Sequence, residues 1–139
     1  MKNPKNILLI LSLIILDQAT KFYFTGKNIE IFKYFSFNFV ANTGMGFGLL
    51  KGFNLLFIFT TLLVILLTYY IMYKKKEKKY QLSFNLIIAG AIGNLIDRIF
   101  RGFVVDFIDI KIWPVFNLAD AFVTIGVVIL AWKMIKEKD

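Results

Sequence analysis

Long apolar stretches separated by short polar segments dominate the pattern along this chain. Four of these stretches approach the roughly 20 residues that a helix needs to cross a bilayer. They cover about residues 7–24, 53–73, 82–100 and 116–135. We therefore predict an all-α membrane protein with four transmembrane helices, built as a single domain over residues 1–139.

The composition agrees with this prediction. Hydrophobic residues make up 58% of the chain and aromatic residues 17%, whereas an average soluble domain is roughly 45–50% apolar. The first stretch follows a basic start, as in a cleaved signal peptide, but the residues after Leu16 lack a small-x-small cleavage signal. We expect this stretch to be kept as a helix.

The charge pattern predicts an orientation. The formal net charge is +8, and positive residues near short loops mark the cytoplasmic side. Most lysines lie at the ends of the apolar stretches: Lys2, Lys5, Lys74, Lys75, Lys76, Lys78, Lys79, Lys133, Lys136 and Lys138. We predict that both termini are cytoplasmic, and we interpret the lysine run at 74–79 as a solvated turn near anionic lipid headgroups rather than a nucleic-acid site.

The segment between the first two stretches is rich in Phe and Tyr and partly alternates in polarity. This pattern predicts short strands that form a small external β-like cradle over about residues 25–48. Glycines at 44, 46 and 48 permit tight turns or close approach to a ligand. A flexible loop leading back into the second helix explains the same glycines, and both interpretations stay open.

Two aspartates beside the apolar stretches, Asp106 and Asp120, give the strongest functional signal. A carboxylate at membrane depth costs about 3 kcal/mol or more, which makes a functional role the first hypothesis. Two close carboxylates share one proton, so one remains a base while the other donates a hydrogen bond, as in an aspartyl protease. For Asp120 alone, an acid at the positive end of a helix dipole is a competing explanation.

The absence of two residue types narrows the chemistry further. The chain has no histidine and no cysteine, which removes the usual general base, thiol nucleophiles and the commonest zinc ligands. Chemistry must therefore use Asp, Lys, Ser, Thr or Tyr. We expect no metal and no cofactor.

Polar residues also share helix faces near the two aspartates. Asp17 and Lys21 are four residues apart at the end of the first stretch, where an interfacial ion pair and a functional role are both open. In the third stretch Asn94, Asp97 and Arg98 share one face, which exceeds what packing needs. Small residues at 89, 90 and 93 predict close contact with neighbouring helices.

Four motif blocks occur in order along nearly the whole chain. They are Asp17-x-x-Thr20-Lys21, Asn42-x-Gly44-x-x-Phe47-Gly48, Gly93-Asn94-x-x-Asp97-Arg98 running to Val104-Val105-Asp106, and Phe116-Asn117-x-Ala119-Asp120. Each block alone is a weak signal, but their order is highly specific. In these blocks the chain resembles the bacterial lipoprotein signal peptidase family, also called signal peptidase II.

The resemblance implies an aspartyl endopeptidase that cleaves prolipoproteins immediately before a diacylglyceryl-modified cysteine. Asp106 and Asp120 would be the catalytic pair, Asp17 and Lys21 would stabilise the outer end of the first helix, and the remaining supports or substrate contacts would be Asn42, Gly44, Asn94, Arg98 and Asn117. The expected partners are these substrates and membrane lipids, with no nucleic acid, and the protein would act as a monomer. It would lie in the bacterial cytoplasmic (inner) membrane with its active site near the outer face.

The resemblance also implies a cradle from about residues 25–48 and a short external helix over the site from about residues 101–115. One pair departs from the family pattern, because Met45-Gly46 stands where the family often has two small alanine-like residues, and its effect on the fine shape of the substrate groove stays open. Two rival functions predict other behaviour. A cation or proton transporter would show ion flux, and an assembly scaffold would tolerate Asp→Asn at both aspartates.

Overall fold

A computed structural model describes residues 4–44, 52–75 and 78–136 of the protein. It contains four long α-helices: α1 (Pro4–Phe24), α2 (Asn54–Lys75), α3 (Gln81–Phe100) and α4 (Leu118–Ile135). A short 3-10 helix, η2 (Lys78–Tyr80), precedes α3. All four helices are long and apolar enough to cross a membrane, which confirms the four predicted stretches to within a few residues at each end.

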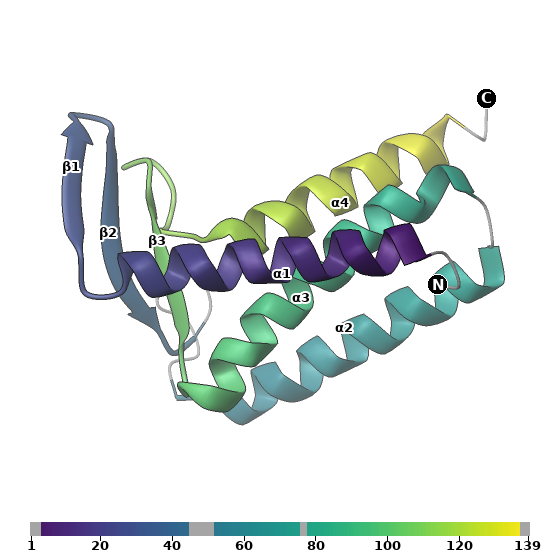
Figure 1. Ribbon diagram of the computed structural model, residues 1–139, viewed down its shortest axis with the longest axis horizontal. Coiled ribbons are helices and arrows are strands. Elements are labelled where there is room, and N and C mark those ends of the chain that lie inside the picture. The colour runs from purple at the N-terminus through teal and green to yellow at the C-terminus, as the bar shows by residue number, and fades with distance from the viewer. Residues whose placement is uncertain (1–3, 45–51, 76–77, 137–139) are drawn as a thin grey trace.

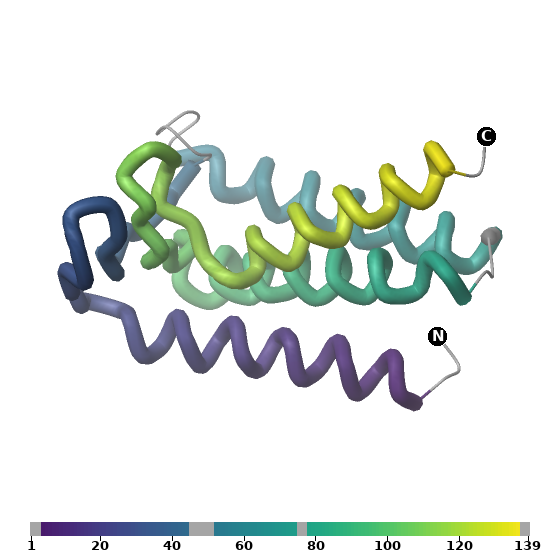
Figure 2. Tube along the Cα trace, turned by 90° about the horizontal axis from the view of Figure 1, so that it is seen from above, coloured from purple at the N-terminus to yellow at the C-terminus, as the bar shows by residue number. Residues whose placement is uncertain are grey.

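Helix α3 lies at the centre of the bundle and packs against the other three helices (Figure 2). It is by far the most buried of the four. A Cβ atom at Gly90 would lie 2.3 Å from the carbonyl oxygen of Ala119, and one at Gly93 would lie 2.6 Å from Oδ2 of Asp17. The prediction of close helix packing at these small residues is therefore confirmed.

The remaining elements form a three-stranded antiparallel sheet at one end of the bundle (Figure 1). Its strands are β1 (Asn28–Phe32), β2 (Phe35–Asn42) and β3 (Val104–Asp109), in the order β1-β2-β3. The first two strands confirm the predicted cradle. The third comes from the segment in which the resemblance implied a short helix.

That expectation of a helix is wrong, since all of residues 101–115 are described and their regular structure is the strand β3. The sequence Val104-Val105-Asp106-Phe107 suits a strand, because β-branched and aromatic residues fit a pleated surface. Backbone pairing with β2 then places Val40 opposite Asp106 and Asn42 opposite Val104. The cradle is therefore built from both connecting segments.

Stacked aromatic rings attach the sheet to the helical bundle. The ring of Phe24, the last residue of α1, lies 4.4 Å from that of Phe37 and 4.6 Å from that of Phe107, measured between centroids. Stacked aromatic pairs at this spacing contribute beyond their buried area. This contact fixes β3, and with it Asp106, relative to α1.

Helix α1 begins and α4 ends at the same end of the bundle, away from the sheet (Figure 1). The four helices of the described part run the length of the bundle an even number of times, and the sheet lies at the end opposite to the start of α1 and the end of α4. This arrangement is the one expected if both termini lie on one side of a membrane.

Candidate active site

The structure brings Asp106 and Asp120 to one cavity. Asp106 is on β3, and Asp120 is in the first turn of α4. Both aspartates line a cavity of about 640 Å³. The lining also includes the polar residues Asn42, Thr60, Asn94 and Arg98, together with Gly44.

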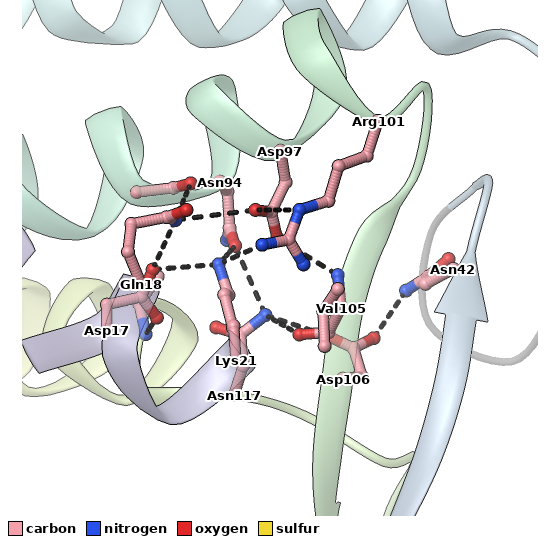
Figure 3. A network of polar contacts seen from close by, with 12 residues as sticks. Asp17, Gln18, Lys21, Asn42, Asn94, Asp97, Arg101, Val105, Asp106 and Asn117 are labelled. Atoms are coloured by element: carbon pink, nitrogen blue, oxygen red, sulfur yellow. Dashed lines mark hydrogen bonds and ion pairs between the residues drawn. The ribbon is translucent and has the colours of Figure 1, made fainter. Parts of the chain in front are cut away.

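Asp106 is almost completely buried, with 2% of its surface exposed. Its Oδ2 accepts a hydrogen bond from Nδ2 of Asn42 at 2.8 Å, and its Oδ1 accepts one from Nδ2 of Asn117 at 2.7 Å (Figure 3). Burial raises the pKa of Asp106 to about 7, the charge of Asp120 adds to this rise, and the two amide bonds oppose it. A carboxyl group with this pKa exchanges its proton near neutral pH, as acid–base catalysis requires.

Asp120 forms a capping box with Asn117 at the start of α4. The backbone N–H of Asp120 donates to Oδ1 of Asn117 at 2.9 Å, and the backbone N–H of Asn117 donates to Oδ2 of Asp120 at 3.2 Å. The competing explanation of Asp120 as a helix-start acid is thus structurally correct. It is incomplete, because Oδ1 of the same carboxylate accepts from Nδ2 of Asn94 at 2.8 Å and the residue lines the cavity.

Asn117 connects the two aspartates. Its side-chain oxygen caps the helix that carries Asp120, while its side-chain nitrogen donates to Asp106. Asn117 is itself fully buried. One asparagine therefore sets the position of both carboxylates relative to each other.

Next to this pair lies a cluster of buried charges. Lys21, Asp17 and Asp97 are all fully buried. The Nζ atom of Lys21 is 2.9 Å from Asp17, 3.1 Å from Asp97 and 2.9 Å from Oδ1 of Asn94, so its three N–H donors have three acceptors. The predicted Asp17–Lys21 ion pair is present and fully buried, and Asp97 and Asn94 of α3 supply the other two acceptors for the Lys21 ammonium.

The cluster orients Asn94 toward the pair Asp106 and Asp120, called the dyad from here on. Because a lysine ammonium only donates, Asn94 must turn its oxygen toward Lys21. The same oxygen accepts from Nδ2 of Asn117 at 3.1 Å. The amide nitrogen of Asn94 is thereby directed at Asp120.

Sequence reasoning noted Asp97 on a polar face but did not include it among the site residues. Its Oδ2 accepts from the backbone N–H of Val105 at 3.0 Å, which fixes the residue before Asp106 (Figure 3). Its Oδ1 lies 3.7 Å from Nε of Arg101. The spacing of Asp97 from Asn94, three residues along one helix, was the signal that could have included it.

Gln18 was missed without a comparable signal. Its amide nitrogen donates to Oδ2 of Asp17 at 3.1 Å, to the carbonyl oxygen of Gly93 at 3.1 Å and to Oδ1 of Asp97 at 3.3 Å. It therefore joins α1 to α3 beside the buried charges. Thr20, from the same motif block, donates to the carbonyl oxygen of Asp17 in its own helix at 2.8 Å.

The second motif block approaches the cavity through Asn42 and Gly44. The backbone N–H of Gly44 donates to Oδ1 of Asn42 at 3.0 Å, which leaves the Asn42 nitrogen for Asp106. A guanidinium nitrogen of Arg98 is 3.4 Å from the carbonyl oxygen of Gly44, and the guanidinium lies 5.0 Å from the centre of the Phe57 ring. Met45-Gly46 and Phe47-Gly48 lie outside the described residues.

The rest of the cavity lining is mainly apolar. It comes from α2 and from the segment around β3 and the start of α4: Leu56, Phe57, Val104, Trp113, Pro114, Val115 and Phe116. An apolar wall beside two carboxylates lowers the local polarity and strengthens charge interactions at the dyad. The cavity is thus suited to a substrate that is largely apolar around one polar, reactive bond.

Comparison with known proteins shows the family of the chain. Residues 9–136 match the family model described as signal peptidase (SPase) II. A lipoprotein signal peptidase of Caldicellulosiruptor bescii is 43% identical over 94% of this chain and 90% of the relative. One of Halothermothrix orenii is 45% identical over 88% of this chain and 90% of the relative.

Solved structures agree with the sequence comparisons. A bacterial membrane enzyme determined at 2.3 Å resolution has a TM-score of 0.91 and 31% identity, covering 100% of this chain and 92% of the other. A second, determined at 1.9 Å resolution, has a TM-score of 0.86 and 32% identity, covering 98% and 96%. The fold and the family assignment therefore support each other.

Proposed function

We propose that this chain, which belongs to the signal peptidase II family, works as an aspartyl endopeptidase through Asp106 and Asp120. The activity of the family is the removal of signal peptides from prolipoproteins. The observation that carries this proposal is the shared cavity of the two carboxylates. Each of their four oxygens accepts one N–H hydrogen bond, from Asn42, Asn94 or Asn117. The reaction class needs no group beyond these side chains and water.

In the proposed reaction the two aspartates share one proton. The ionised carboxylate takes a proton from a water molecule, and the water oxygen attacks the carbon of the scissile peptide carbonyl. The protonated carboxyl donates a hydrogen bond to the carbonyl oxygen as negative charge develops there. The C–N bond then breaks, and the leaving amine receives a proton from the dyad.

The other site residues have supporting roles in this proposal. Asn42, Asn94 and Asn117 orient the carboxylates through the amide bonds described above. Asp17 and Lys21 fix Asn94 through the buried charges. Arg98 and Gly44 line the cavity next to the dyad, where they contact the substrate backbone.

The protein is a multi-pass membrane protein, and the distribution of its charges supports a proposal for its orientation. The start of α1, the end of α2, η2 and the end of α4, all of which carry lysines, lie on one side, opposite the sheet (Figure 1). We propose that this side is the cytoplasm and that the sheet and dyad face outward from the bacterial inner membrane. The chain would then act as a monomeric single domain, surrounded by membrane lipids and binding no nucleic acid.

The proposed substrate is a prolipoprotein whose cysteine carries a diacylglyceryl group, cleaved immediately before that cysteine. The mostly apolar cavity wall supports a substrate that arrives from the bilayer, while the dyad supplies the polar chemistry. The test is gel-shift cleavage of purified precursor in detergent, with the unmodified precursor as control. We expect cleavage of the modified precursor only; folded protein that cleaves neither, or that conducts ions in vesicles, would contradict the proposal.

A further inference from the structure

A second cavity reaches Asp120 beside the one that contains the dyad. Its volume is about 350 Å³, within the lower range of ligand pockets. Trp113 and Phe116 border both cavities, and Asp120 contributes to both. The two side chains therefore act as a wall between two spaces that meet at one catalytic carboxylate.

The second cavity runs along one face of α4. Its lining includes Ala121, Thr124 and Ile125, which share one helix face by their spacing. Ile125 is 50% exposed and belongs to a helix long and apolar enough to cross a membrane. The occupant best suited to such a lining is an apolar chain, since among the described residues that line it Thr124 is the one polar side chain besides Asp120.

The backbone at both ends of the wall is fixed. The N–H of Phe116 donates to the carbonyl oxygen of Ile108 at 3.1 Å, and the N–H of Ile108 donates back at 2.8 Å. At the other end Oδ2 of Asp109 accepts from Nδ2 of Asn38 at 2.7 Å and from Nζ of Lys111 at 2.7 Å. The segment that carries Trp113 is thus bonded to the sheet on both sides.

A strained turn within this segment shows that its shape is imposed. Lys111 has a φ of +65°, which is uncommon for a residue other than glycine. The N–H of Ile112 donates to the carbonyl oxygen of Ile110 at 2.9 Å, which closes a γ-turn around Lys111. The side chain of Asp109 stabilises the turn by accepting from the Lys111 N–H at 2.9 Å.

We propose that the second cavity binds one acyl chain of the substrate's diacylglyceryl group, while the peptide occupies the larger cavity across the wall of Trp113 and Phe116. This inference rests on the proposed function. The lipidated cysteine adjoins the bond that is cut, so its thioether lies near Asp120. From there an acyl chain enters the apolar cavity that runs from Asp120 along one face of α4.

The test compares two synthetic prolipopeptides that differ only in acyl length, one dioctanoyl and one dipalmitoyl, at a fixed ratio of substrate to detergent. Ala121→Phe fills the cavity without touching the larger one. Loss of the contacts that bury two methylenes of an acyl chain corresponds to about tenfold weaker binding of the substrate. We expect Ala121→Phe to raise KM for the dipalmitoyl substrate about tenfold and to leave the dioctanoyl substrate within about twofold.

Val128→Phe is the matched control, because Val128 lies two turns further along the same helix face, is 62% exposed and lines neither cavity. It should leave both substrates unchanged. If Ala121→Phe does not fold, Ile125→Trp narrows the same cavity and should give the same split. Equal effects on both acyl lengths, or none, would overturn the acyl-chain site while leaving the protease intact; a wild-type protein that cleaves neither substrate would instead refute the proposed function.

Discussion

Removal of the buried lysine should destabilise the protein far more than removal of an exposed one. Lys21→Met keeps a similar stem but deletes the ammonium that lies 2.9 Å from Asp17 and 3.1 Å from Asp97. Both carboxylates are fully buried and would lose their closest positive partner. Asp97 would keep Arg101 nearby, at 3.7 Å, whereas Lys21 is the one basic partner recorded for Asp17 among the described residues.

The size of the effect follows from the cost of unpaired buried charge. Deleting one partner of a buried ion pair typically costs about 3–5 kcal/mol. Lys21 also fixes Asn94, so the loss should reach the dyad as well as the bundle. We expect Lys21→Met to lower the free energy of unfolding by about 3–5 kcal/mol and to reduce cleavage even where the protein is folded.

The assay is an equilibrium unfolding titration with SDS in mixed micelles, alongside cleavage rates. Lys33→Met is the matched control, since Lys33 is exposed and lies 5.1 Å above the ring of Tyr34; a surface change of this kind should stay within about 0.5 kcal/mol. The double variant Asp17→Asn/Lys21→Met should recover part of the loss, because one unpaired charge is gone. Equal stability of Lys21→Met and Lys33→Met would refute the reasoning.

Other consequences can be measured on the same preparations. Because the pKa of Asp106 in the folded protein is raised to about 7, its contribution to the free energy of unfolding is complete below about pH 4 and is lost as the pH rises through about 7. Asp106→Asn should remove this pH dependence from the free energy of unfolding. Cleavage should decline above about pH 7 as the dyad loses its shared proton, and Asn42→Ala, which removes a bond that lowers this pKa, should move the decline to higher pH in a pH–rate profile. A pH–rate profile that Asn42→Ala leaves unchanged would contradict the assignment of this decline to Asp106. Gly93→Ala should lower the free energy of unfolding by about 1–3 kcal/mol, because its Cβ would meet Asp17, and an unchanged SDS titration would show that the helices can separate without cost.

Local patterns were sufficient to predict the helices. Apolar length alone located all four, and small residues at 90 and 93 indicated where α3 approaches its neighbours. The resemblance in motif order named the residues that the structure brings to one cavity, including Asp106, Asp120 and Asn94.

Pairing between distant segments could not be predicted in the same way. β3 pairs with β2, which lies more than sixty residues earlier. The local sequence of β3 favours a strand, but nothing in it indicates which distant segment offers the edge, and the resemblance implied a helix there. Asp97 and Gln18 gain their importance from Lys21 and Gly93 on other helices. A hydrogen bond between side chains that are remote in sequence leaves little trace in the spacing of either one.

The most direct test of the central claim is cleavage of a diacylglyceryl-modified prolipoprotein by Asp106→Asn and Asp120→Asn, beside wild type and Asp109→Asn. Asp109 is an acid on the same strand that faces the turn at Lys111 rather than the cavity, which makes it the matched control. We predict cleavage by wild type and Asp109→Asn and none by the two dyad variants, with all four proteins folded. Undiminished cleavage by either dyad variant would contradict the account.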